Sequence, residues 1–391
     1  MPGMMLTPVI AAIALAAWVY LVAGRGAFWR ASVRDDSDRE ADLRVFPSVV
    51  AVVPARNEAD LIAESLRSLF SQDYPGSFSI VMVDDQSRDG TAAVATRTAE
   101  QLQAQDRLMI VSGQPPPSHW TGKVWAMKQG VDRADRLPDP PCYLLFTDAD
   151  IAYAPDTLKR LVARAETGGL VLTSLMAKLR CESFAERALI PAFVFFFQML
   201  YPFAWVNRRD RAMAAAAGGC MLVHRDALRA AGGVEAISDA LIDDCAMGRK
   251  LKSIGPIWLG LTERARSLRA YPDVSDIRRM VSRSAYDQLR YSPLLLAGTI
   301  AGMALIYLVP PFFTLFGSGL SRALGAAAWA VMALAFQPIL RFYRVSALWG
   351  LALPAIACAY MVFTIDSAYQ HLRGKGGLWK GRIQANTSGN Q

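Results

Sequence analysis

Short apolar runs alternate with amphipathic stretches through the middle of the chain. The runs are rich in β-branched residues, as strands are, and the stretches between them place apolar residues at helical spacing. The expected strands are 48–53, 79–83, 108–111, 143–146, 170–173 and 220–224, and the expected helices are 60–70, 91–102, 124–134 and 155–166. Strands that alternate with helices in this way predict an α/β domain with a mainly parallel sheet.

Longer apolar windows flank and interrupt this domain. Five of them contain no Asp, Glu, Lys or Arg: 1–24, 188–207, 291–321, 323–340 and 345–365. A helix that crosses a bilayer needs about 20 such residues, so membrane helices are expected. The window 188–207 contains Pro191 and Pro202 and falls within the α/β domain. We therefore favour a helix in the membrane interface there over a spanning helix or a buried core helix.

The first window predicts an uncleaved membrane anchor. It has no basic segment before it, as a signal peptide would, and Arg25, Arg30 and Arg34 follow it. Basic residues on its C-terminal flank predict that the α/β domain faces the cytoplasm. The organisation expected is an anchor at 1–24, an α/β domain at 25–290 with interfacial helices near 184–207 and 276–290, a membrane region of about three helices at 291–366, and a basic tail at 367–391.

The side of the membrane on which this tail lies is left open by the sequence. Three crossings after a cytoplasmic domain would place the tail outside, against the rule that basic segments stay inside. Either one apolar segment is re-entrant or the tail is an exception to the rule.

Composition and charge agree with a membrane protein. Hydrophobic residues make up 53% of the chain and charged residues 19%, which excludes intrinsic disorder and a purely cytoplasmic enzyme. The net charge is +8, but seven Lys or Arg and one acid follow Tyr291, so most of the excess lies in membrane-flanking loops and the tail rather than on a nucleic-acid surface. The five cysteines include no CxxC pair, so neither a zinc site nor a disulfide framework is indicated.

Acidic segments follow three of the expected strands. They are PARNEAD at 54–60, DDQSRDGT at 84–91 and TDADI at 147–151. In α/β sheets ligands bind beyond the carboxyl ends of the strands, so chemistry is expected there. Asp148 and Asp150 could hold Mg²⁺ or Mn²⁺ beside a diphosphate, or could simply lie in a solvated loop. A further pair, Asp243 and Asp244, opens an amphipathic helix, where one carboxylate could serve only the helix dipole.

These motifs resemble those of a known family. Together with GKVWAMKQG, AGGCMLVHRDAL, the LIDDC pair, SAYDQLRYSPLLLAGT and LWKGR, they are similar to the family 2 glycosyltransferases with a GT-A fold. Within that family they most resemble the membrane-bound branch, namely the hopene-associated glycosyltransferases of bacteria (HpnB) and ceramide-glucosyltransferase-like proteins. The resemblance extends from about residue 44 to residue 382.

The resemblance implies an enzyme of the bacterial inner membrane. It would transfer a sugar, with inversion, from a nucleotide-diphosphate sugar to a lipid acceptor in hopanoid or related lipid metabolism, using Mg²⁺ or Mn²⁺. The nucleotide-sugar would be bound by Pro54, Ala55, Asn57, Glu58, Asp85, Lys123 and Asp148. Asp150, with Asp148, would bind the metal, Asp244 would be the general base with Asp243 as the rival, and Arg290 and Tyr291 would lie on the acceptor and diphosphate side.

One motif departs from the family pattern. The QxxRW signature of polysaccharide synthases is DQLRY here, so Asp287 replaces glutamine and Tyr291 replaces tryptophan. This difference counts against a processive polysaccharide synthase. Two further functions stay open at this point, namely a non-catalytic membrane module that keeps the fold and a nucleotidyltransferase of similar fold.

Overall fold

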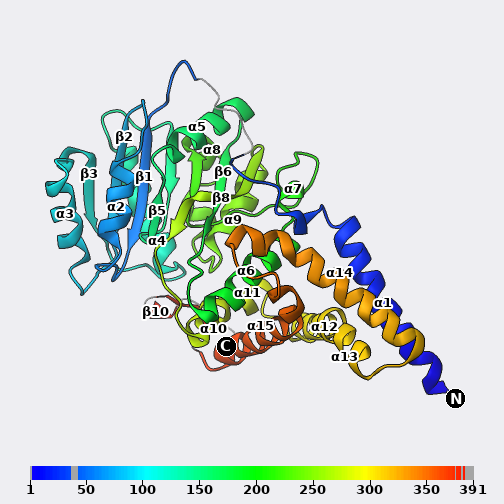
Figure 1. Cartoon of the computed structure of the whole chain (residues 1–391). Coiled ribbons are helices and arrows are strands. Elements are labelled where there is room, and N and C mark those ends of the chain that lie inside the picture. Colours follow the sequence, from blue (N-terminus) through cyan, green and yellow to red (C-terminus); the bar gives the residue numbers. More distant parts are fainter. Residues whose placement is uncertain (1, 37–42, 375, 380–381, 384–391) are drawn as a thin grey trace.

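The computed structural model describes residues 2–36, 43–374, 376–379 and 382–383. Its central element is an eight-stranded sheet of order β3-β2-β1-β4-β7-β6-β8-β5 (Figure 1). The strands are β1 (Val49–Ala55), β2 (Phe78–Asp84), β3 (Leu108–Ser112), β4 (Tyr143–Phe146), β5 (Ile151–Tyr153), β6 (Leu172–Lys178), β7 (Met221–His224) and β8 (Ile257–Ser267). All six expected strands are present.

The prediction of a mainly parallel sheet is confirmed only in part. β3, β2, β1 and β4 are parallel, and so are β6 and β8, but β7 runs antiparallel to both β4 and β6, and β5 runs antiparallel to β8. The sheet is therefore mixed. β5 and β8 were also missing from the expectation, because β5 has only three residues and the second half of β8, TERARS, alternates charged side chains as a loop can.

Helices cover both faces of the sheet. α2 (Ile62–Phe70), α3 (Thr91–Gln101) and α5 (Thr157–Gly168) pack on one face, and α4 (Gly122–Asp135), α8 (Arg225–Ala230) and α9 (Asp243–Lys252) pack on the other. Every side chain of β1 is buried, and successive residues of this strand contribute to the two cores in turn. Gly130 lets α4 approach β1, since a Cβ there would lie 2.4 Å from Val52 Cγ1.

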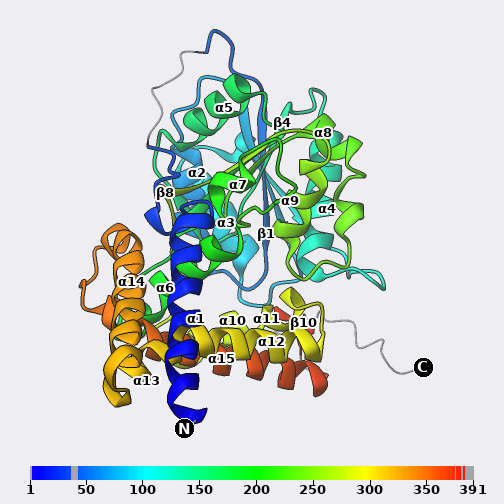
Figure 2. The same ribbon diagram turned by 90° about the vertical axis from the view of Figure 1, so that its right-hand side faces the viewer.

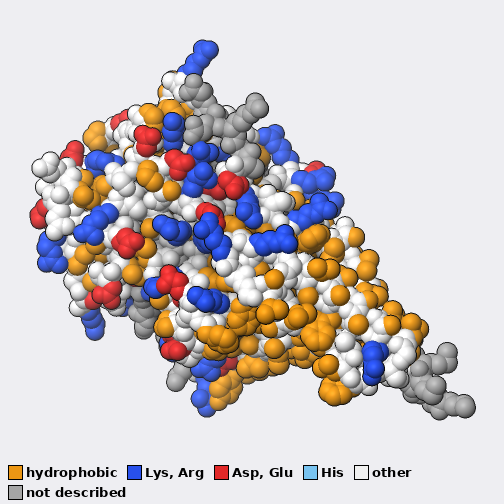
Figure 3. Space-filling model, viewed as in Figure 1, with side chains coloured by type: hydrophobic (Ala, Val, Ile, Leu, Met, Phe, Trp, Pro, Cys, Tyr) orange, Lys and Arg blue, Asp and Glu red, His pale blue; other side chains and the backbone are white. Residues whose placement is uncertain are grey.

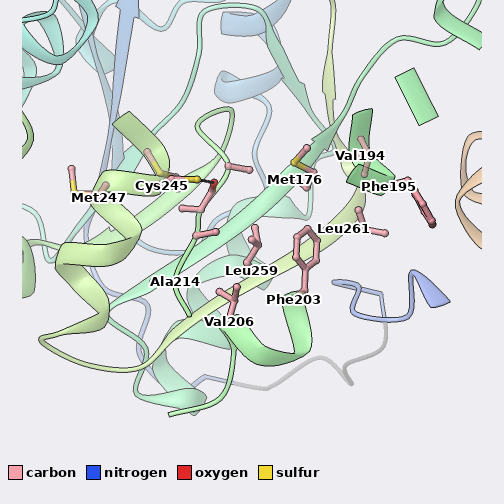
Figure 4. Close-up of a cluster of buried hydrophobic side chains, with 14 of the residues drawn as sticks. Met176, Val194, Phe195, Phe203, Val206, Ala214, Cys245, Met247, Leu259 and Leu261 are labelled. Carbon is pink, nitrogen blue, oxygen red and sulfur yellow. Dashed lines mark hydrogen bonds between the residues drawn. The ribbon is translucent and has the colours of Figure 1, made fainter. Parts of the chain in front are cut away.

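One of the two cores continues into the apolar helices. α6 (Phe184–Leu200) and α7 (Phe203–Val206) pack against β6 and β8, and Figure 4 shows Val194, Phe195 and Phe203 beside Met176 and Leu261. The N-terminus of α6 is fixed by a capping box between Ser183 and Glu186. Glu186 also accepts a hydrogen bond from the backbone N–H of Tyr271, at 2.7 Å. The helix is thereby fixed to the sheet domain.

The remaining apolar helices lie at one end of the sheet domain (Figures 1 and 2). They are α1 (Pro2–Gly24), α12 (Pro293–Met303), the π-helical turn η4 (Ala304–Leu308), α13 (Val309–Phe316), α14 (Gly319–Tyr343) and α15 (Trp349–Leu372). Five helical stretches are long and apolar enough to cross a membrane: Leu6–Gly24, Phe184–Val206, Pro293–Phe316, Gly319–Tyr343 and Trp349–Leu372. Figure 3 shows hydrophobic side chains over this part, whereas charged side chains cover the sheet domain.

The expected interfacial helix at 276–290 is two short helices instead. They are α10 (Val274–Ser282) and α11 (Ala285–Gln288), separated at Arg283 and Ser284. On α10, Ile277 and Val281 are buried, as the amphipathic pattern predicts. The C-terminal motif LWKGR contributes to β9 (Leu378–Trp379) and β10 (Arg382–Ile383), while its residues 380–381, like residues 375 and 384–391 of the basic tail, lie outside the described part of the chain.

Candidate active site

The loops after β1 and β2 interlock at the carboxyl edge of the sheet. The side-chain amide oxygen of Asn57 accepts a hydrogen bond from the backbone N–H of Arg88 at 2.9 Å, and the backbone N–H of Glu58 donates to the Thr91 hydroxyl at 2.9 Å. Asn57 has a φ of 50°, in the left-handed region that asparagine tolerates better than most residues. The two loops therefore form one unit with fixed backbone geometry.

Two acidic residues hold this unit together. Asp89 accepts hydrogen bonds from the backbone N–H groups of Ala59 and Thr91, at 2.9 and 3.1 Å, so it acts as a turn residue. Asp85 follows β2 and is 1% exposed, and its backbone N–H donates a hydrogen bond to the carbonyl of Ala55, at 2.8 Å. Pro54 and Ala55 end β1 beside Asp84 and Asp85, so four expected nucleotide-site positions, Pro54, Ala55, Asn57 and Asp85, adjoin one another.

Arg269 joins this unit to the DxD segment. Its Nε donates to Asp150 Oδ2 at 2.7 Å, and its Nη2 donates to both oxygens of Glu58, at 2.6 and 2.8 Å. Burial raises the pKa of Asp150, and the neighbouring Asp148 carboxylate raises it further, more than Arg269 lowers it. Arg269 was not singled out from the sequence, because it follows β8 and its two partners lie 119 and 211 residues away along the chain.

Lys123 links the DxD segment to the acidic pair of α9. Its Nζ lies 2.8 Å from Asp148 Oδ1 and 3.1 Å from Asp243 Oδ2. Burial alone would lower the pKa of Lys123, but the carboxylates of Asp148 and Asp243 outweigh burial and hold this pKa above its usual value. Lys123 is thus a positive charge between two acidic segments. Lys128, which also belongs to α4, pairs instead with Asp132 and Glu235.

Asp244 is held by backbone donors at the start of α9. Its Oδ2 accepts from the N–H of Gly218 at 2.8 Å, and its Oδ1 accepts from the N–H of Cys245 at 2.7 Å. Burial, reinforced by the adjacent Asp243 carboxylate, raises the pKa of Asp244 to about 6. The two acids therefore differ in surroundings: Asp243 faces Lys123, and Asp244 faces the backbone of the segment before β7.

Arg290 and Tyr291 lie beside α15. Both have φ in the left-handed region, 51° and 55°, where the chain turns from α11 into α12. The ring of Tyr291 stacks on His371 of α15 with ring centroids 4.3 Å apart, and the Tyr286 hydroxyl donates to the Tyr291 carbonyl at 2.8 Å. Within the described part of the chain, no hydrogen bond or ion pair joins Arg290 or Tyr291 to the carboxylates at the sheet edge.

The carboxylates suit a metal that is shared with a substrate. Mg²⁺ and Mn²⁺ are commonly bound through one or two carboxylates together with substrate phosphates. Asp148 and Asp150 supply that number, whereas nowhere among the described residues do three or more His, Cys, Asp or Glu side chains gather as a metal site of their own. The donor set therefore fits a divalent cation that binds together with a diphosphate.

A family model described as "Glycosyl transferase family 2" matches residues 50–232. Residues 50–232 are thus similar to that family. The matched segment runs from β1 through α8 and includes Asp85, Lys123, Asp148 and Asp150, whereas Asp244 and Arg269 lie beyond it.

Curated relatives match parts of the chain. An N-acetylglucosaminyltransferase of Azorhizobium caulinodans is 30% identical over 160 residues, which are 40% of this chain and 38% of that protein. An N-acetylglucosaminyltransferase of Rhizobium leguminosarum bv. viciae is 29% identical over 133 residues, which are 34% of this chain and 28% of that protein. The chain thus spans well under half the length of these relatives.

A solved structure matches nearly the whole chain. The mannosyltransferase from Pyrobaculum calidifontis, determined with GDP-Man and Mn²⁺, is 21% identical with a TM-score of 0.53, and the match covers 93% of this chain and 99% of that one. At this identity the likeness shows the fold, which is that of the GT-A glycosyltransferases with a mixed sheet.

Proposed function

We propose that this chain is a membrane-bound, inverting glycosyltransferase that moves a sugar from a nucleotide-diphosphate sugar to a lipid acceptor. One observation carries the proposal. Lys123 lies between Asp148 and Asp243, so the DxD segment and the acidic pair of α9 meet in one site of a family 2 segment. The apolar helices at one end of the same domain support a lipid as the acceptor.

The donor would bind on the interlocked loops at the sheet edge. Pro54, Ala55, Asn57, Glu58 and Asp85 are the proposed contacts to the nucleotide, and their fixed backbone would hold it with little loss of conformational freedom. Lys123 would turn from Asp148 toward the diphosphate, and Arg269 would lie on the other side of it. A divalent cation bound by Asp150 and Asp148 would offset the negative charge that develops on the leaving nucleoside diphosphate.

Asp244 is the proposed general base. It would accept the proton of the acceptor hydroxyl while that oxygen attacks the anomeric carbon from the side opposite the leaving group, which inverts the configuration. With a pKa of about 6 its carboxylate is mostly ionised at neutral pH and is still basic enough to take a proton. Asp243 is the rival for this role, but its carboxylate already pairs with Lys123.

The acceptor side is proposed from the resemblance and from the position of α11. Arg290 and Tyr291 lie where the sheet domain meets the apolar helices, and we assign them to the acceptor and diphosphate side. A hopanoid or related lipid is the acceptor we propose. The names of the relatives and of the solved structure suggest N-acetylglucosamine and mannose as the first sugars to test.

We propose the following domain limits and cellular location. An anchor at 1–24, a catalytic domain at 25–290, a membrane region at 291–366 and a tail at 367–391 would place the protein in the bacterial inner membrane. Arg25, Arg30 and Arg34 after the first apolar helix support a cytoplasmic catalytic domain, which is where nucleotide-sugars are made.

The test is a transfer assay with the purified full chain in lipid nanodiscs. It would be incubated with Mn²⁺, with UDP- and GDP-linked sugars in turn, and with total bacterial lipid, and the lipids would then be analysed by mass spectrometry. A lipid that gains one sugar, with nucleoside diphosphate released and with loss of the product in Asp244→Asn, is the expected result. A polymeric product would indicate a polysaccharide synthase, and pyrophosphate release would indicate a nucleotidyltransferase.

A further inference from the structure

α15 contacts the sheet domain and its attached helices along its whole length. In its first turn Trp349 packs edge-on against Phe184 of α6, with ring centroids 5.4 Å apart. Near its middle the Tyr360 hydroxyl donates to the Leu189 carbonyl at 2.9 Å, and in its last turn His371 stacks on Tyr291. A helix of 24 residues is about 36 Å long, and a spanning helix of that length could touch a domain outside the bilayer only near one end.

The side of α15 that faces α10 and α11 carries its polar groups. The Ser282 hydroxyl donates to Asp366 Oδ2 at 2.9 Å, and the Ser367 hydroxyl donates to the Ser282 carbonyl at 2.6 Å. Arg278 of α10 lies 3.9 Å from Asp366. An ionisable residue at the centre of a bilayer is costly, but here Asp366 is bound to the sheet domain's own helices.

The opposite side of α15 is an exposed, uncharged stripe. Its residues recur at intervals of three or four, which places them on one face of the helix. They are Leu351, Ala355, Cys358, Val362, Ile365, Tyr369 and Leu372. A helix with one such face outward and polar contacts on the other has the pattern of a helix that lies in a membrane interface.

α1 and α14 have a different arrangement. They lie side by side and point away from the sheet domain, and in Figure 2 they run across the direction of α12 and α15. α13 packs closely on α14, since a Cβ at Gly325 would lie 2.8 Å from the Pro310 carbonyl oxygen. In the most apolar 18-residue window of α15, 50% of the residues are buried in the protein, whereas only 17% are buried in the corresponding window of α1. If α1 and α14 cross the membrane, α15 lies in its plane.

We infer that α15 does not cross the membrane but lies flat in the leaflet that faces the sheet domain, with its exposed stripe against the lipid. Its partner is a bilayer surface with anionic headgroups, because Arg344 before it, Arg373 after it and Arg279 of α10 are exposed beside it. Only two passages through the membrane then follow the sheet domain. One runs through η4 and α13, which pack on α1, and one returns through α14, whereas α12 lies in the direction of α15. The basic tail therefore returns to the side of the sheet domain, in agreement with the positive-inside rule.

Membrane depth along the stripe tests the orientation. Single spin labels would be placed at Leu351, Cys358, Ile365 and Leu372 in full-length protein with Cys142→Ser and Cys181→Ser, and with Cys358→Ser wherever another position is labelled. The protein would be reconstituted in phosphatidylethanolamine–phosphatidylglycerol vesicles. Depth would be read from collision with oxygen and with a water-soluble nickel complex. We expect nearly equal depths at the four positions. A spanning helix would instead change depth by about 10 Å for each seven residues.

The exposed positions Leu6, Ile13 and Tyr20 of α1 are the matched control, since they have the same spacing. Their depths should change steeply. A depth that rises and falls along α15 would overturn the inference, and so would a flat profile along α1, because α1 would then not define a spanning direction.

The side of the tail tests the consequence independently. An impermeant maleimide would be applied to intact cells and to inverted vesicles that contain one of two variants. One is Cys358→Ser, in which Cys142 is exposed on the sheet domain, and the other is Arg373→Cys with Cys142→Ser and Cys358→Ser. Both positions should be labelled in the same preparation. Labelling from opposite sides would overturn the inference. The comparison does not depend on catalysis or on which side the sheet domain faces, so its failure is separate from a failure of the proposed function.

Discussion

Replacing Arg269 with glutamine should lower the stability of the protein, because Arg269 pairs with two largely buried carboxylates. The side chains of Glu58 and Asp150 are 10% and 12% exposed, and Arg269 is the cation that bonds to both. Removing one partner of a buried ion pair typically costs about 3–5 kcal/mol, since the remaining charge stays desolvated. Arg269 itself is 28% exposed, so water reaches the site, and we expect a loss of about 2 kcal/mol.

A divalent cation should restore part of that loss. A ligand present at 100 times its dissociation constant stabilises the protein it binds by about 2.7 kcal/mol. In Arg269→Gln the guanidinium no longer competes with the cation for Asp150, so Mn²⁺ should bind several-fold more tightly than it binds the wild type and should narrow the stability gap.

The assay is thermal unfolding of the detergent-solubilised full chain, in EDTA and in saturating Mn²⁺, with titration of Mn²⁺ by calorimetry. One kcal/mol shifts the melting temperature of a domain of 150–250 residues by about 2–4 °C, so the variant should melt about 4–8 °C lower in EDTA. Arg266→Gln, an exposed position of β8, is the control and should change little. An equal deficit with and without Mn²⁺, or wild-type stability in EDTA, would refute the reasoning.

Further predictions concern the proposed catalytic groups. Asp244→Asn should lower the transfer rate by about 10²-fold or more with donor affinity nearly unchanged. A larger loss of rate in Asp243→Asn would reverse the two assignments. The rates would be measured in single-turnover experiments and the donor affinities by nucleotide titration. The base must be ionised, and burial raises the pKa of Asp244 to about 6. The transfer rate should therefore be constant above pH 6 and fall about tenfold for each pH unit below it. A pH–rate profile that is flat down to about pH 4 would contradict this. Asp150→Ala should abolish the gain in nucleoside diphosphate affinity that Mn²⁺ gives, and calorimetry with equal gains in variant and wild type would exclude a metal at Asp150.

The sequence was sufficient where a feature depends on neighbouring residues. β1, β2 and β4 are apolar runs that end in acidic segments, so their limits and the meeting of 54–60 with 84–91 followed from local pattern and the geometry of parallel strands. The direction of β7 and the role of Arg269 could not be predicted in this way, because both depend on pairing between distant segments. The orientation of α15 was hidden for another reason: a spanning helix and an interfacial helix of 24 residues can share one composition, and only packing separates them.

The position of Lys123 has a thermodynamic consequence. One ammonium group serves an acid of the DxD segment and an acid of α9, so a donor that draws Lys123 away from Asp243 changes the electrostatic potential at the acceptor side. In the proposed enzyme, donor and acceptor then bind with a coupling free energy. Such coupling is reciprocal, so the factor by which donor alters acceptor affinity equals the factor by which acceptor alters donor affinity. The strength of this coupling would thus depend on a single shared positive charge.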